Sequence, residues 1–184
     1  MFAYSDSRLI DHNILRLKKV ILDTNSYPKF LPWCSGARII TQTEAGFTAD
    51  LIISFKGMNI KYTSLVTVKD TMEDNDKNNK ELSGRHEERK KECATERDGV
   101  KRAMPAFKKR VVYIKATMID GPFEFLNSSW ELQMVDEDKT DVKFKTEFSL
   151  KSKFLQKLMH PMLGYASNKI LKSFEKYINS QLKT

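Results

Sequence analysis

The sequence has few of the residues from which disulfide frameworks and metal sites are built. Its 184 residues include two cysteines, Cys34 and Cys93, and three histidines, His12, His86 and His160. The cysteines lie far apart in different sequence contexts, which argues against a CxxC site or a disulfide framework, and both are expected to be free thiols. No two histidines stand at the spacing of a shared metal site. We therefore expect no metal and no catalytic cofactor.

Long hydrophobic runs are also lacking. No stretch approaches the roughly 18 apolar residues of a membrane-spanning helix. Residues 1–17 lack the basic start and apolar block of a signal peptide. Hydrophobic residues make up 40% of the chain and charged residues 30%, which suits one soluble domain over residues 1–184 with a real core. We expect a cytoplasmic protein, either free or held peripherally at the inner face of the membrane.

Acidic residues are scarce toward the end of the chain. The net charge is +8, and residues 139–184 hold ten lysines and no arginine against three acidic residues, a balance of +7. A basic surface can meet an anionic membrane or a nucleic acid, but lysines also keep surfaces soluble without any partner. Our candidates for membrane contact are Lys169, Lys172 and Lys176, on the polar side of the last predicted helix. We expect no specific DNA binding.

Apolar periodicity predicts a series of strands with helices at both ends. Residues 13–24 have helical spacing, with Asp11 or Asn13 as the N-cap. The last 30 residues form one helix, or two that meet at a kink at Pro161. Alternation is clearest over residues 142–150, which have one apolar and one polar face. The predicted strands cover residues 3–10, 37–42, 47–55, 60–68, 111–119, 126–135 and 142–150.

The pattern stops between residues 70 and 110. This stretch is almost without apolar periodicity and is dominated by charged residues, asparagine, glycine and serine. A structureless excursion of this length does not belong in a compact core. We interpret residues 70–110 as an insertion within the domain, disordered or weakly ordered, and expect it to be dispensable for folding.

Strands followed by a terminal helix favour an α+β fold, in which a curved antiparallel sheet wraps around a long C-terminal helix. The apolar faces of sheet and helix then enclose either a filled core or a cavity, and burial alone does not separate the two. Strand parity and the helical stripe predict the residues of this interior, which are Phe55, Tyr62, Trp130, Phe144 and Phe148 from the sheet and Leu163 and Ile170 from the helix.

The polar groups predicted at inward strand positions are hydroxyls and not acid–base pairs. They belong to Tyr62, Ser64, Thr117 and Thr146. A catalyst needs titratable groups aimed at one cavity, and the sequence has neither a phosphate-binding glycine loop nor a nucleophile elbow. We therefore expect a protein that binds an apolar ligand and is not an enzyme.

Residues 27–34 form a corner that combines two prolines, three aromatic residues and a cysteine. Because proline restricts its own backbone and that of the preceding residue, the chain must turn here. Large apolar side chains on so short and stiff a segment favour burial. The corner either caps the core or forms the lip of a pocket, and in the second case Phe30, Leu31 and Trp33 would contact the ligand.

Three blocks of the sequence resemble one protein family. They are the corner at residues 27–34, residues 48–57, and Asp120-Gly121-Pro122-Phe123 with Leu126 and Trp130. Together they resemble the coenzyme Q-binding proteins of the START-like, polyketide cyclase-related superfamily, in which a few residues stand in place of the excursion. The resemblance implies a helix-grip fold with a hydrophobic cavity and a role in delivering or positioning ubiquinone for respiration. Phe123, in the third block, completes our set of pocket candidates.

The resemblance leaves two other functions open. A close bacterial branch consists of ribosome-association toxins that bind the large ribosomal subunit, and such a protein would use the C-terminal lysines to meet phosphates. We expect the toxin branch to vary at the position of Trp33. This residue therefore favours the coenzyme Q-binding proteins. An enzyme of the cyclase type would need an inward carboxylate or histidine beside Tyr62. We expect ubiquinone or a similar isoprenoid lipid as the ligand, with ribosome association as the alternative.

Overall fold

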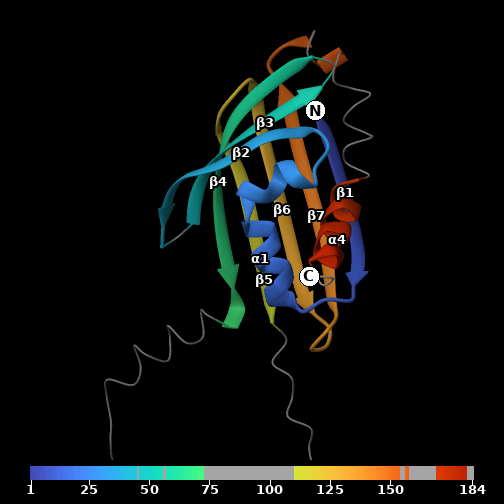
Figure 1. Ribbon diagram of the computed structural model, residues 1–184. Coiled ribbons are helices and arrows are strands. Elements are labelled where there is room, and N and C mark those ends of the chain that lie inside the picture. The colour runs from blue at the N-terminus through green and yellow to red at the C-terminus, as the bar shows by residue number, and fades with distance from the viewer. Residues whose placement is uncertain (45, 56, 73–109, 154–155, 158–168, 182–184) are drawn as a thin grey trace, which may run out of the picture.

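The centre of the computed structural model is a seven-stranded antiparallel sheet (Figure 1). The structure describes residues 1–44, 46–55, 57–72, 110–153, 156–157 and 169–181. Across the sheet the strands follow the order β1-β7-β6-β5-β4-β3-β2. The elements are β1 (Phe2–Ile10), α1 (Ile14–Leu22), the 3₁₀ helix η1 (Thr24–Lys29), β2 (Cys34–Thr43), β3 (Gly46–Phe55), β4 (Met58–Asp70), β5 (Val111–Asp120), β6 (Phe123–Met134), β7 (Thr140–Leu150) and α4 (Ile170–Ser180).

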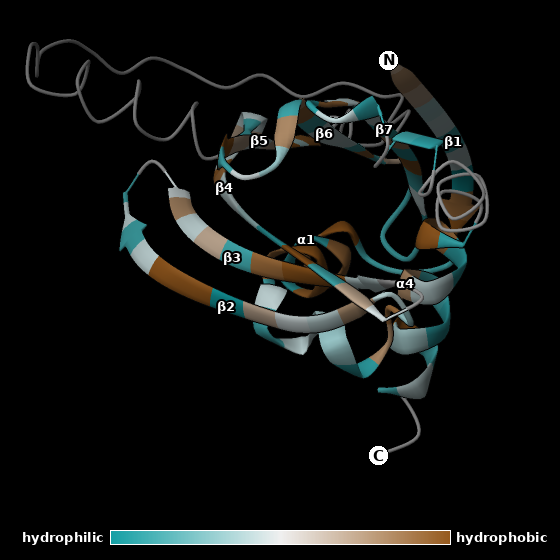
Figure 2. Ribbon diagram, turned by 90° about the horizontal axis from the view of Figure 1, so that it is seen from above, coloured by the Kyte–Doolittle hydropathy of each residue, from teal (hydrophilic) through white to brown (hydrophobic). Residues whose placement is uncertain are grey.

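The sheet is a meander with one long crossing. Each strand from β2 to β7 pairs with its neighbours in sequence, and β1 joins the opposite edge by pairing with β7. Seen from above, the sheet curves, and α1 and α4 lie on its inner side (Figure 2). This arrangement confirms the predicted α+β fold with a curved antiparallel sheet and a C-terminal helix.

Local sequence explains most element boundaries. Helix α1 begins after Asn13, whose side-chain oxygen accepts a hydrogen bond from the Leu15 backbone N–H at 2.8 Å. Its buried residues are Ile14, Leu17 and Ile21, as helical spacing predicts. Strand β7 alternates as predicted, with Val142, Phe144, Thr146 and Phe148 buried and Lys143 and Lys145 exposed.

Helix α4 packs through Leu171, Phe174 and Ile178, which are buried. The predicted stripe contained Phe174 and Ile178, as well as Ile170, which packs against the core, but it omitted Leu171. Residues 158–168, with the predicted kink at Pro161, lie outside the described residues. Within the described part of the chain, no helix combines the length and apolar character needed to cross a bilayer.

A buried ion cluster joins the ends of β4 and β5. The Asp70 carboxylate, in a residue that is 2% exposed, accepts hydrogen bonds from Arg110 Nε and Nη2 at 2.9 and 2.6 Å and from Lys18 Nζ at 2.8 Å. Burial opposes ionisation of Asp70, but the bonds from Arg110 and Lys18 outweigh it and lower the pKa of the carboxyl group. Asp70, the last residue of β4, and Arg110, which directly precedes β5, therefore belong to the folded domain, although the predicted insertion included them. Residues 73–109 lie outside the described residues.

Candidate functional site

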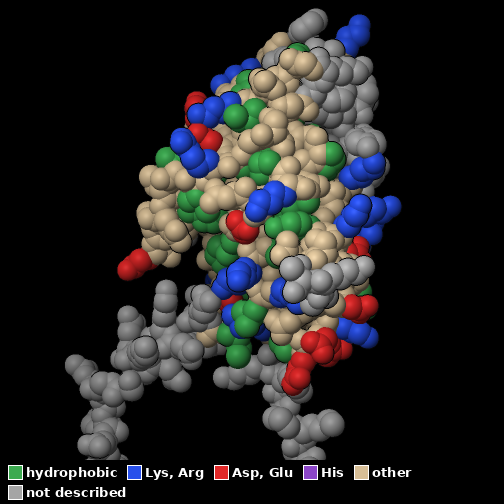
Figure 3. Space-filling view, in the orientation of Figure 1, with side chains coloured by type: hydrophobic (Ala, Val, Ile, Leu, Met, Phe, Trp, Pro, Cys, Tyr) green, Lys and Arg blue, Asp and Glu red, His purple; other side chains and the backbone are tan. Residues whose placement is uncertain are grey.

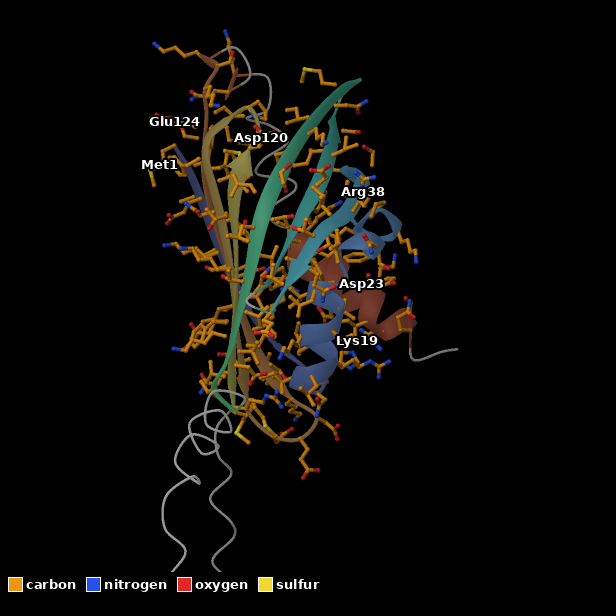
Figure 4. All side chains as sticks on the ribbon, turned by 90° about the vertical axis from the view of Figure 1, so that its left-hand side faces the viewer. Met1, Lys19, Asp23, Arg38, Asp120 and Glu124 are labelled. Carbon is orange, nitrogen blue, oxygen red and sulfur yellow. The ribbon has the colours of Figure 1, made fainter. Side chains whose placement is uncertain are left out.

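A cavity of about 140 Å³ lies between the inner face of the sheet, the corner at residues 27–34 and the start of α4. Strands β3 to β7 contribute most of its wall, which is largely apolar. Charged side chains such as Lys19, Asp23 and Arg38 are exposed on the outer side of α1, η1 and β2 (Figure 4). The fold therefore separates an apolar interior from a charged surface.

Six of the predicted pocket residues come together around this cavity. The Trp130 ring packs against Phe144 and Phe174, with ring centroids 4.5 and 4.9 Å apart. The six are Leu31, Trp33, Tyr62, Trp130, Phe144 and Ile170. Their contact with a ligand stays a prediction.

Two predicted residues, Phe123 and Phe148, lie in a separate cluster. Their rings pack edge to face at 5.9 Å, and together with Ile60 and Leu150 they form a second buried group apart from the main core. Parity placed Phe148 on the correct face of the sheet, but it does not say how far along a curved strand the cavity extends. These two rings are core residues and do not line the cavity.

The corner at residues 27–34 both lines the cavity and anchors itself to α4. Tyr27, Leu31, Trp33 and Cys34 contribute to the wall. Phe30, which we had expected in the wall, instead stacks on Tyr177 of α4 at 4.3 Å and meets Phe174 at 4.9 Å. The two remaining candidates, the Phe55 side chain and Leu163, lie outside the described residues.

The side chains that line the cavity are neutral at neutral pH. Burial raises the pKa of Cys34 to about 11 and raises the pKa values of Tyr27 and Tyr62 well above that of free tyrosine. The other side chains of the wall, among the described residues, are aliphatic, aromatic or hydroxyl groups. Because an apolar site penalises charge, this wall suits an uncharged ligand.

The turn between β5 and β6 holds Tyr62 in place. Gly121 has a φ of +148°, and a Cβ atom there would lie 2.8 Å from Cβ of Tyr62, so only glycine fits without strain. The next ring along the chain, Phe123, packs edge to face on Tyr62 at 5.6 Å. The Gly-Pro-Phe block seen in the sequence therefore sets the position of the Tyr62 ring.

Comparison with known families settles the class of the protein. The model of the family described as polyketide cyclase/dehydrase and lipid transport matches residues 19–175. The chain belongs to this family. Membership confirms the START-like, polyketide cyclase-related resemblance.

The relatives of this chain include ribosome association toxins and a coenzyme Q-binding protein. The ribosome association toxin RatA of Rickettsia prowazekii is 27% identical over 183 residues, which cover 100% of both chains. The mitochondrial coenzyme Q-binding protein COQ10 of Drosophila melanogaster is 32% identical over 65 residues, which cover 35% of this chain and 27% of COQ10. Both expected branches are therefore found among its relatives.

Solved structures agree with this family assignment at the level of the fold. The Zhui aromatase/cyclase from Streptomyces sp. R1128 has a TM-score of 0.66 at 9% identity. The alignment covers 98% of this chain and 95% of the aromatase/cyclase chain. A STAR-related lipid transfer protein from Xanthomonas axonopodis has a TM-score of 0.61 at 11% identity. That alignment covers 96% of this chain and 85% of the lipid transfer protein chain.

Several residues that line the cavity were not predicted from the sequence. Ala49 and Ala116 line it, as does Ser128. The signal that could have found them is a small residue at an inward position between large ones, because such a residue leaves room. Thr117 was placed inward, but its neighbour Ala116 lines the cavity, so the alternation of β5 turns Thr117 to the other face.

The C-terminal lysines of the protein lie on the surface as predicted. Lys169, Lys172 and Lys176, which we call the α4 lysines, are exposed. Lys and Arg side chains are spread over the helix-bearing side of the molecule (Figure 3). The structure thus makes these lysines accessible, while their partner stays a prediction.

Proposed function

We propose that this protein binds ubiquinone or a similar isoprenoid lipid in its cavity and acts as a carrier that supports respiratory electron transport. The observation that carries the proposal is the apolar, neutral wall beneath a curved sheet. A quinone head is uncharged and presents carbonyl acceptors, so hydroxyl donors suffice and a buried ion would be a cost. The similarity to COQ10 over 65 residues supports the same ligand class.

The size of the cavity matches a single ring, so most of a tail would extend beyond it. Cavities that enclose drug-sized ligands span roughly 300–1,000 Å³, and an engineered cavity of about 150 Å³ in another protein accepts benzene. A volume of about 140 Å³ is therefore close to that of a single ring. Each buried CH₂ of an isoprenoid tail adds about 0.8 kcal/mol, so a short enclosed segment supports the moderate affinity that suits a carrier.

Two experiments test the proposal. Lipids extracted from the protein purified from its own host and analysed by mass spectrometry should contain an isoprenoid quinone. The chain has two tryptophans, Trp33 and Trp130, and both line the cavity. Titration with a short-tailed ubiquinone should therefore quench the intrinsic fluorescence to saturation. Purified protein without quinone, together with a linear decrease that never saturates, would refute the proposal.

A non-enzymatic role is part of the proposal. Although a structural neighbour is an aromatase/cyclase, the ionisable groups that line this cavity among the described residues are Tyr27, Cys34 and Tyr62, and burial holds all three in their neutral forms. General acid–base catalysis works best with a pKa near the operating pH. We therefore expect quinone to leave the protein chemically unchanged.

Ribosome association is the second candidate, and the similarity to RatA along the whole chain favours it. A second hollow of about 690 Å³, on the outer face of β1, β7, β6 and β5, gives this function a surface on the other side of the sheet, with Trp130 and Phe144 lining both hollow and cavity. Lys115, Lys143 and Lys145 line it; Lys143 pairs with Glu131 at 3.1 Å and Lys145 with Glu147 at 2.7 Å. Within the described part of the chain, Lys115 has no ion-pair partner.

Sedimentation with purified large ribosomal subunits separates the two candidates. Binding through lysines to phosphates should weaken steeply as salt increases, whether or not the cavity holds a ligand. Lys115→Glu tests the outer hollow, and the matched reversal of the α4 lysines tests the helix surface. Absence of co-sedimentation at low salt would count against this candidate, and co-sedimentation that resists salt and both sets of reversals would count against contact through these lysines.

Peripheral membrane contact through the α4 lysines would serve a quinone carrier. Each basic residue near an anionic bilayer contributes about 1 kcal/mol, and the exposure of these three side chains permits such contact. A cytoplasmic protein of this kind would meet its lipid ligand at the inner face of the membrane.

A further inference from the structure

Most polar groups in the cavity wall are already satisfied within the protein. The Tyr27 hydroxyl donates to the Ile21 carbonyl at 2.5 Å and is also hydrogen-bonded to Thr24. The Ser128 hydroxyl is bonded to that of Thr146 at 2.8 Å, and Cys34 Sγ donates to the Gly36 carbonyl at 3.4 Å. These four lining groups therefore have little capacity left for a ligand.

Two hydroxyls on β4 are the exception. Ser64 is 2% exposed, and its Oγ has no hydrogen-bond partner among the described residues. No hydrogen bond within the described part of the chain involves the Tyr62 hydroxyl. Tyr62 is half-buried, whereas the Ser64 hydroxyl is fully buried. A fully buried hydroxyl without a partner lowers stability, so native structures rarely retain one without a reason.

These two hydroxyls belong to the same side of the cavity. Tyr62 and Ser64 stand two residues apart on one face of β4, so their Cα atoms are roughly 6.7 Å apart along the strand. Opposite Ser64, in register on β3, is Ala49, which also lines the cavity. Gly121 and Phe123 hold the Tyr62 ring from the other side.

We propose that the hydroxyls of Tyr62 and Ser64 form a donor pair for a carbonyl oxygen of the ligand, which makes β4 the head-group side of the cavity. This inference rests on the proposed function and assigns the head and the tail of the ligand to different places. A ring that reaches Ser64 fills most of a 140 Å³ cavity, so a long isoprenoid tail extends beyond it. Affinity should then depend on the carbonyl group and only weakly on tail length beyond the first isoprene units.

The test uses variants that each remove one oxygen atom. Tyr62→Phe and Ser64→Ala should each raise the Kd for a short-tailed ubiquinone by about 2- to 10-fold, as expected for the loss of one neutral hydrogen bond. Neither should alter binding of an isoprenoid hydrocarbon of equal tail length, which lacks both the quinone head and any hydrogen-bond acceptor. The matched control is Thr140→Val, which removes a buried hydroxyl outside the cavity wall that already donates to the His12 carbonyl at 2.8 Å, and it should leave the Kd for quinone unchanged.

Two further readouts separate this role from a structural one. Without ligand, Ser64→Ala should melt at the same or a higher temperature than the parent, because it removes an unpaired polar group, whereas Thr140→Val should melt lower, because it removes a buried hydrogen bond. The infrared carbonyl band of bound quinone should shift to lower frequency in the parent and back toward the free value in Ser64→Ala and Tyr62→Phe.

The outcomes distinguish the two levels of the hypothesis. If the parent binds quinone and both single variants bind it equally well with an unchanged carbonyl band, the donor pair is refuted and the proposed function stands. If the parent binds no quinone, the proposed function is refuted and the donor pair with it.

Discussion

Ala49→Leu is the change that best tells a cavity from a filled core. Ala49 is fully buried on β3, lines the cavity and is in register with Ser64. Leucine adds three carbon atoms at this position and points them into the space that we assign to the quinone ring. A lined cavity accepts these atoms, and a close-packed core does not.

The two possibilities predict changes of opposite sign. If the space is empty, burial of three more carbons contributes about 2 kcal/mol, and the lost side-chain freedom of leucine takes back about 0.5–1 kcal/mol. For a domain of this size the melting temperature should then rise by about 2–6 °C. In a filled core, overpacking would cost about 1–3 kcal/mol, and the melting temperature would fall by about 2–12 °C.

Thermal melting followed by circular dichroism measures the sign, and tryptophan quenching measures the ligand. We expect Ala49→Leu to melt at or above the parent temperature and to lose the saturable quenching by short-tailed ubiquinone. The matched control is Ala37→Leu, the same change at a half-buried position on β2 that does not line the cavity, and it should keep quinone binding. A destabilised Ala49→Leu, or a stable one that still binds quinone as the parent does, would refute the cavity.

Three further predictions concern the rest of the molecule. Replacement of residues 73–109 by a short Gly/Ser turn should change the melting temperature by less than about 3 °C, because closing a shorter loop saves little entropy; a large loss would show that the segment packs against the domain. Reversal of the α4 lysines to glutamate should weaken pelleting with anionic vesicles and leave the melting curve nearly unchanged, since exposed charges contribute less than about 1 kcal/mol each; vesicle binding equal to the parent would exclude this surface. Asp70→Asn should destabilise the protein by about 3 kcal/mol, because it leaves the half-buried cations of Lys18 and Arg110 without their counter-charge. The lowered pKa of Asp70 means that its contribution is complete above the unfolded-state value near 4 and is lost as pH falls through the folded-state value, so acid titration of the variant should lack this step.

The sequence is informative about the fold because alternation and helical spacing are local signals. Strand β7 shows this best, since each apolar residue predicted for its inner face is buried. Helix α4 shows the limit, because Ile170 lines the cavity as predicted, whereas the predicted stripe omitted its buried neighbour Leu171. The Asp70 cluster could not be predicted from the sequence either, because it joins three segments that only tertiary structure brings together.

The candidate site was likewise predictable from the sequence only where local signals decide it. Parity identified Tyr62, Trp130 and Phe144 correctly as lining residues. It could not exclude Phe148, because the end of the cavity along β7 depends on the curvature of the sheet. Ser64 was recognised as an inward hydroxyl, but its lack of a hydrogen-bond partner is a property of everything packed around it. Small lining residues such as Ala49 carry a weak signal in sequence, although they create the space.

The ion cluster at Asp70 affects how long the connection between β4 and β5 can be. The strand ends that flank residues 73–109 are fastened to each other by Arg110 and to α1 by Lys18, and the Thr71 hydroxyl accepts a hydrogen bond from the Val111 N–H at 3.1 Å. The connection therefore does not have to hold β4 and β5 together, and each doubling of its length costs only about 0.6 kcal/mol. This junction is a place where evolution can add sequence cheaply. A protein engineer could use it in the same way, by splicing a reporter or an affinity domain between β4 and β5 while the cavity keeps its walls.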